Sequence, residues 1–290
     1  MVSTSMKSVI VLFVLLKVSA SSVWGAPQEA LPERYDEPAH EDPATESRVD
    51  PILKTLPPSP PSEMGHETTI LKHPYQCALF ISRRFAGSCT IISEDFALAT
   101  SVYLFGVFPF DVTLKIGATN VNKDGTLVYI NDFYTHPDYE YTADNDIVLL
   151  QFDRKISFSK TIQPIGLALT SPPPGESVSL SGWGEGIANN SWALHETELK
   201  IIDQDVCNAT TNGEATEKII CAGSDRVFVC DHDIGDPIVY NNTLVGMYVG
   251  GYSVCRNDNI IYTRISSYHE YLKNLIKKVR KGAFEEKSSE

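Results

Sequence analysis

Two features are missing from this 290-residue sequence: an excess of positive charge and any long apolar run. The 24 lysine and arginine residues are outnumbered by 37 aspartate and glutamate residues, so the net charge is −13. An acidic chain repels the phosphate backbone, and we therefore expect no nucleic-acid partner. The apolar run from Val9 to Leu16 is too short to span a bilayer comfortably, and no second run follows it. We accordingly expect no membrane anchor.

Cysteine is scarce as well. No cysteine precedes Cys77, which excludes a small disulfide-knotted module before that point, and no CxxC pair suggests zinc. The stretch "ATNVNKDG" lacks the several carboxylates that a calcium loop needs, so we expect no metal and no cofactor. An even number of cysteines, six, indicates three disulfides in an exported chain, with about fifteen possible arrangements.

The start of the chain has the plan of a secretory signal peptide over residues 1–26. Lys7 precedes the apolar run, and the small residues Ser19 and Ala20 follow it. Residues 27–61 are rich in acids and end in "TLPPSPP", which predicts an extended pro-region or linker. Sequons at Asn189, Asn208 and Asn241 fit the same compartment. We expect a secreted, extracellular glycoprotein.

From Ser62 onward, short apolar runs such as "CALFIS", "DIVLLQF" and "TLVGMYVG" alternate with turn residues. This pattern predicts an all-β sandwich or barrel over residues 62–281, followed by a polar tail, residues 282–290. The closing "SSYHEYLKNLIKKVRKG" has apolar residues at helical spacing, which indicates one amphipathic helix against the barrel. We interpret its lysines and arginines as a solvated face.

Eight segments of this region, in order and spacing, resemble the trypsin-like or chymotrypsin-like serine proteases. They are "HPYQCALF", "TIISEDFALATSVY", "NDIVLLQF", "LSGWGEG", "CNATTNGEATEKIICAG", "CDHDIGDPIV", "LVGMYVGGYSVC" and "IIYTRIS". The resemblance implies two six-stranded antiparallel β-barrels that meet near Gln163 to Leu169, a C-terminal helix, and a site between the barrels.

The resemblance also assigns the catalytic positions. The family motif "LTAAHC" matches Leu98 to Tyr103, which places Val102 at the general base, and "GDSGGP" matches His232 to Pro237, which places Ile234 at the nucleophile. Only the aspartate remains, as Asp146. A hydrocarbon side chain can neither accept a proton nor attack a carbonyl. We therefore expect a chain that is not an enzyme.

Further family features have changed. Phe228, Gly251 and Ile260 occupy the former specificity pocket, where an aromatic floor and a branched wall should close the slot. "SEMG" stands where cleavage would expose the family's new amino terminus, so Asp233 keeps the acceptor without the expected donor. Asp233 is then either exposed to solvent or satisfied by another group.

The disulfide pattern that the resemblance implies departs from the family at one place. Cys207 with Cys221 and Cys230 with Cys255 match two family bridges. The bridge beside the catalytic histidine is absent, because Gly87 and Tyr103 take its positions. The remaining Cys77 and Cys89 lie symmetrically about "SRRF", so an antiparallel hairpin would make them cross-strand neighbours.

Three functions fit these observations. The leading hypothesis is a non-catalytic serine protease homologue that binds an extracellular protein, such as a protease or its substrate, and regulates a proteolytic cascade. The second is an active hydrolase with relocated groups, for example Ser101 and His232. The third is a structural or carrier glycoprotein. The sequence leaves the oligomeric state open.

Overall fold

A computed structural model of the chain describes residues 65–184, 191–211, 213, 215–224, 229, 231–250 and 260–287. These ranges leave out the predicted signal peptide, the predicted linker and the last three residues of the predicted polar tail. They also leave out Asn189, Phe228, Cys230, Gly251 and Cys255. Within the described ranges, none of the helices combines the length and apolar content that a membrane span requires.

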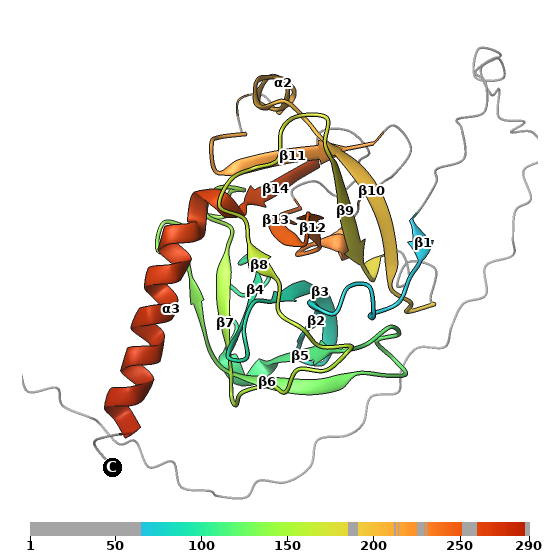
Figure 1. The fold of residues 1–290 in the computed structure, drawn as a ribbon. Coiled ribbons are helices and arrows are strands. Elements are labelled where there is room, and N and C mark those ends of the chain that lie inside the picture. Colours follow the sequence, from blue (N-terminus) through green and yellow to red (C-terminus); the bar gives the residue numbers. More distant parts are fainter. Residues whose placement is uncertain are drawn as a thin grey trace, which may run out of the picture. The chain divides into compact units, whose positions relative to one another are not determined.

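Six antiparallel strands close the first barrel in the order β2-β3-β4-β7-β6-β5 (Figure 1). In β5 the alternating Val112, Leu114 and Ile116 are buried, as expected for a strand with one face in a core. The strands are β2 (Gln76–Ile81), β3 (Arg84–Ile91), β4 (Phe96–Ala99), β5 (Val112–Ile116), β6 (Thr126–Thr135) and β7 (Val148–Phe152). A short 3-10 helix, η2 (Pro109–Asp111), precedes β5.

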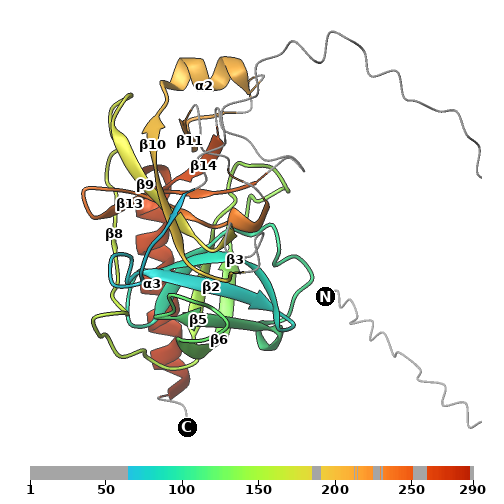
Figure 2. The ribbon, with the colours of Figure 1, turned by 90° about the vertical axis from the view of Figure 1, so that its right-hand side faces the viewer.

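The second barrel closes in the order β9-β10-β11-β14-β13-β12, because β9 pairs with both β10 and β12. Two short strands add to this sheet: β1 (His66–Glu67) pairs with β10 (Figure 1), and β8 (Gly166–Leu167) pairs with β13 (Figure 2). The strands of the ring are β9 (Ser177–Gly182), β10 (His195–Ile201), β11 (Ile219–Gly223), β12 (Pro237–Tyr240), β13 (Thr243–Tyr248) and β14 (Ile260–Arg264). The prediction of two six-stranded barrels is confirmed.

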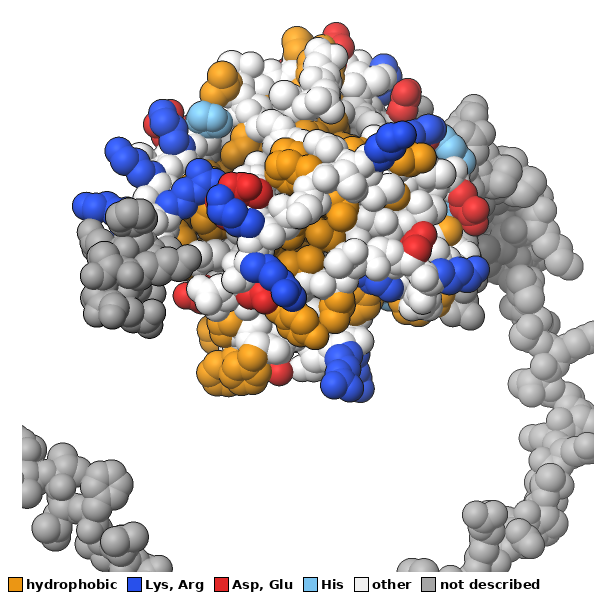
Figure 3. Space-filling view, turned by 60° about the horizontal axis from the view of Figure 1, so that its bottom comes forward, with side chains coloured by type: hydrophobic (Ala, Val, Ile, Leu, Met, Phe, Trp, Pro, Cys, Tyr) orange, Lys and Arg blue, Asp and Glu red, His pale blue; other side chains and the backbone are white. Residues whose placement is uncertain are grey.

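Helix α3 (Ile265–Lys287) begins directly after β14, which confirms the predicted C-terminal helix. Its buried Ile265, Tyr268 and Leu272 share one hydrophobic cluster with residues of both barrels, among them Phe96 and Met247. Its lysine and arginine side chains between residues 273 and 281 are exposed, and Arg280 pairs with Asp95 at 2.9 Å. Figure 3 shows lysine and arginine side chains among hydrophobic ones on the molecular face at the lower end of Figure 1. These contacts fix the helix across both barrels.

Two disulfides lie within the described residues. Cys77 and Cys89 are directly opposed on β2 and β3, with their Cα atoms 4.8 Å apart, so the predicted hairpin bridge is confirmed. Cys207 and Cys221, with Cα atoms 5.9 Å apart, join helix α2 (Gln204–Thr210) to β11. The third predicted pair, Cys230 with Cys255, lies outside the described residues.

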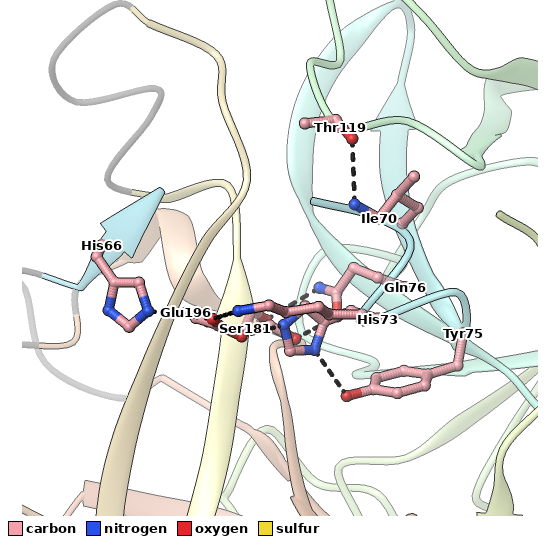
Figure 4. Close-up of polar contacts among 9 residues, drawn as sticks. His66, Ile70, His73, Tyr75, Gln76, Thr119, Ser181 and Glu196 are labelled. Carbon is pink, nitrogen blue, oxygen red and sulfur yellow. Dashed lines mark hydrogen bonds and ion pairs between the residues drawn. The ribbon is translucent and has the colours of Figure 1, made fainter. Parts of the chain in front are cut away.

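The carboxylate of Glu196 on β10 binds three side chains from the first described residues of the chain (Figure 4). Its carboxylate accepts from Lys72 Nζ at 2.5 Å, from His66 Nε2 at 3.0 Å and from His73 Nε2 at 2.6 Å. Burial alone would raise the pKa of Glu196, but the hydrogen bonds from Lys72 and His73 lower that pKa to about 2. Burial lowers the pKa of His73, whose Nδ1 then accepts from the buried hydroxyl of Tyr75 at 3.1 Å. The network therefore ties residues 66–75 to the second barrel.

Candidate functional site

Val102, Asp146 and Ile234 line one pocket of about 580 Å³. Val102 follows β4, Asp146 precedes β7, and Ile234 follows the 3-10 helix η3 (Asp231–Asp233). The other lining residues are Tyr139, Tyr141, Thr142, Ala143, Asp144, Thr216, Val249, Gly250 and Ile261. The structure thus brings together the three residues that the resemblance assigns to catalytic positions.

Ile234 is held by its backbone as well as by packing. Its side chain is 6% exposed, and its carbonyl accepts from the Ser88 amide of β3 at 2.8 Å. A Cβ added at Gly87 would lie 2.3 Å from this carbonyl oxygen. This close approach requires glycine at position 87, where the family has a cysteine. The backbone at Ile234 therefore packs directly against Gly87.

Asp146 is 2% exposed, and its carboxylate accepts from the backbone amide of Ser101. Its own carbonyl accepts from Thr263 Oγ1 at 2.8 Å. Burial raises the pKa of Asp146 to about 7, and hydrogen bonds from the amides of Ser101 and Val102 offset only part of that effect. The carboxyl therefore changes its charge near neutral pH.

The loop between β6 and β7 adds five lining residues that the sequence interpretation missed: Tyr139, Tyr141, Thr142, Ala143 and Asp144. The two rings lie with centroids 5.5 Å apart, and the exposed ring of Phe105 meets Tyr141 edge-on at 4.9 Å. Asp144 Oδ1 accepts from Thr216 Oγ1 at 2.6 Å. The signal was present in "HPDYEYTADND", where tyrosines and acids alternate directly before Asp146.

Two acids, Asp233 and Asp236, flank Ile234 between the end of η3 and the start of β12. Asp236 is 1% exposed, and its Oδ1 has no hydrogen-bond partner among the described residues. A Cβ at Gly182 would lie 1.8 Å from Asp236 Oδ2, and a Cβ at Gly184 would lie 1.8 Å from Asp233 Oδ1. These two glycines therefore make the room for the two carboxyls.

The two carboxyls of this pair influence each other. Burial raises the pKa of Asp236 well above its usual value, and the charge of Asp233 adds to the rise. The hydrogen bond with Ser88 acts in the opposite direction, whereas the hydrogen bond with Asp233 favours the protonated form. Asp233 itself is half-buried. The sequence left open whether Asp233 is exposed to solvent or satisfied by another group of the protein. The second alternative is observed, because Asp233 shares a hydrogen bond with Asp236.

The remaining candidate residues are spread over the domain. Ser101 is 2% exposed and its hydroxyl has no hydrogen-bond partner among the described residues, whereas His232 is exposed. Ile260 is buried in the core of the second barrel. Asn208 and Asn241 are exposed, as glycosylation requires. Within the part of the chain that is described, no group of three His, Cys, Asp or Glu side chains is placed to hold a metal ion.

Comparisons with known proteins agree with this architecture. Residues 63–272 match the family model described as trypsin. The chain is 28% identical over 226 residues to trypsin epsilon of Drosophila erecta, covering 74% of this chain and 87% of that protein. It is 30% identical over 205 residues to trypsin theta of Drosophila melanogaster, covering 67% of this chain and 77% of that protein.

Among solved structures, the scabies mite inactivated protease paralogue S-D1 superposes with a TM-score of 0.68 at 23% identity. The superposition covers 74% of this chain and 97% of that one. At this identity, the likeness concerns the fold alone.

Proposed function

We propose that this chain, which belongs to the trypsin family, is a secreted, non-catalytic homologue that acts by binding another extracellular protein. The predicted signal peptide and sequons support secretion. The partner is a protease or a protease substrate, and the chain acts as a regulator or cofactor of an extracellular proteolytic cascade.

The lining of the pocket is the observation that carries this proposal. Acyl transfer requires a nucleophile next to a base, and the base is oriented by a third group. The described residues at this pocket include an acid that could orient a base, Asp146, and the hydroxyls of Thr142 and Thr216, but no histidine or lysine to act as the base and no serine or cysteine. The positions where the family has its base and nucleophile hold Val102 and Ile234. A concave, largely apolar pocket with a few polar groups is suited to binding.

The main alternative, a relocated serine and histidine, is disfavoured by accessibility. Ser101 is the serine nearest in sequence to Val102, and it is buried and does not line the pocket. A nucleophile must come within about 3–3.5 Å of the carbonyl carbon that it attacks. A buried hydroxyl cannot make that approach to a protein substrate without a rearrangement of the loop.

Affinity capture from the native fluid, with the intact secreted chain as bait, tests the proposal. Tyr141→Ala removes a ring that is 58% exposed and lines the pocket, and Tyr129→Ala removes one that is 49% exposed on β6, outside the pocket. We expect a partner that is retained by wild type and Tyr129→Ala and lost with Tyr141→Ala. Capture of no specific protein, or equal capture by all three baits, would contradict pocket-mediated binding and favour a structural or carrier glycoprotein.

A further inference from the structure

The pocket is chemically asymmetric. Asp144 and Asp146 both line it, and none of the other ten described lining residues carries a positive charge. An ionised carboxylate has about four acceptor sites, and the contacts of Asp146 with two backbone amides leave acceptor capacity unused. The side chain of Val102, directly beside it, has no donor to offer beyond its backbone amide. When ionised, the two acids therefore have no counter-charge among the described lining residues.

Away from the acids the walls are apolar and aromatic. Ile234, Val249 and Ile261 supply aliphatic surface, and Tyr139 and Tyr141 supply ring surface. A lysine or arginine side chain has the matching form, because an apolar stem carries a cationic head with several donors. Aromatic ring faces also attract cations. A neutral apolar group would leave the acids without a counter-charge, and an anion would be repelled.

We propose that this pocket receives an arginine or lysine side chain of the bound protein, with its cationic head against Asp144 and Asp146. The inference rests on the binding function proposed above and specifies the chemistry of the partner at that site. The head group occupies the place beside Asp146 where the side chain of Val102 has no donor. The stem lies against the tyrosine rings and the aliphatic wall.

Among the described residues, the other charged and titratable groups around the acids do not supply a cation. Lys218 donates to Asn145 Oδ1 at 2.9 Å, and that amide, rather than a pocket acid, is its partner. The Tyr268 hydroxyl accepts from the backbone N–H of Asn145 at 2.8 Å. Burial lowers the pKa of His136 and raises the pKa of Tyr139, Tyr268 and Asp146. Between about pH 6 and 8, Asp146 is thus the pocket group whose charge should change, and cation binding should strengthen as pH rises.

Matched peptides test the proposal on the intact secreted protein. Acetyl-Ala-Ala-Arg-Ala-Ala-amide is compared by calorimetry with the same peptide carrying citrulline, which keeps the shape of arginine but removes its charge. We expect the arginine peptide to bind about 10-fold or more tightly at pH 8, the usual effect of one charged hydrogen bond. The ratio should decrease toward pH 6.

Two variants locate the effect. Asp146→Asn should bring the ratio of the two affinities close to one, whereas Asp153→Asn makes the same change outside the pocket and should leave it unchanged. Val102→His places a ring beside Asp146 and should compete with the peptide. It provides a second test that does not depend on the folding of Asp146→Asn.

Each outcome has a distinct meaning. Equal affinity for the two peptides would overturn cation recognition and leave pocket-mediated binding in place. Discrimination that survives both Asp146→Asn and Val102→His would overturn the assignment to this pocket. Absence of binding by either peptide would also overturn the proposal, while the capture experiment judges the binding function separately.

Discussion

Asp236 stands where the resembled motif has a glycine, and its carboxyl is buried beside that of Asp233. The folded chain holds a proton on Asp236 more firmly than the unfolded chain, where the pKa of the group is near 3.8. A raised folded-state pKa means that stability is greatest below the unfolded pKa and decreases as the pH rises above it. The residue therefore makes the fold sensitive to alkaline conditions.

Replacing Asp236→Asn tests this at the scale of one residue. The amide does not ionise and can donate to Asp233, so we expect the variant to be more stable than wild type by about 1–3 kcal/mol near pH 8. The gain should vanish as the pH approaches 4. Thermal unfolding at several pH values measures it, with Asp153→Asn as the control. A variant less stable at every pH would contradict an unfavourable buried charge at this site.

The sequence revealed some residues of the pocket and not others, for physical reasons. Val102, Asp146 and Ile234 could be found because each belongs to a motif with neighbours at fixed spacing. Tyr139 and Tyr141 lie in a loop without periodicity, so only the fold shows that their rings reach the same pocket. The burial of Asp236 depends on Gly182 and Gly184, about fifty residues earlier, and no local pattern predicts such an approach.

Among the secondary-structure elements, the β2–β3 hairpin was the easiest to predict, because the two cysteines flank its turn symmetrically. We expect the double replacement of Cys77→Ala and Cys89→Ala to lower the free energy of unfolding by about 2–5 kcal/mol. Denaturant unfolding under non-reducing conditions measures the loss. An unchanged transition midpoint would show that the barrel core alone fixes the hairpin.

The short strand β1 was not predicted, and Glu196 provides much of what holds it to β10. The lowered pKa of Glu196, about 2, means that its contribution is present above its unfolded pKa of 4.5 and is lost as the pH falls toward 2. Glu196→Gln should reduce stability by about 1–2 kcal/mol at pH 7, a modest value because Lys72 is solvent-exposed. The difference from wild type should close on acidification.

Glu198→Gln on the same strand is the matched control, because Glu198 is exposed. Chemical unfolding at pH 7 and pH 3 compares the variants. An equal effect of the two replacements would contradict a specific role for the network around Glu196.

For the whole molecule, the departures from an active protease are distributed over separate elements. Restoring Val102→His and Ile234→Ser together should still leave ester hydrolysis roughly a thousandfold or more below that of active relatives. His232 stands where the resembled motif has a glycine. The carboxyls of Asp233 and Asp236 interact with each other on either side of Ile234. Ile260 is buried in the core of the second barrel. Each of these acts on a different requirement of catalysis.

Hydrolysis of a panel of peptide esters by the folded double variant, with Ile234→Ser alone as the control, measures this. Robust turnover by the double variant would contradict a change spread over the whole molecule. It would point instead to an otherwise intact catalytic apparatus that lacks two side chains.

The overall architecture could be predicted because eight ordered segments carry the alternation of buried strands and turns. The arrangement of charge inside the pocket could not be predicted, because the pocket forms where the loop before β7 lies next to the segment after η3. Sequence order specifies the two barrels, and only their packing sets which side chains meet between those loops.

The central claim is that the chain binds a protein and does not cleave one. Its most direct test is turnover by the natural secreted protein, purified from its fluid, on a broad panel of peptide esters together with fluorophosphonate labelling. We expect no hydrolysis above the rate of a heat-denatured sample and no labelled serine. Steady turnover, with the label on a single serine such as Ser101, would contradict the claim and establish a relocated active site.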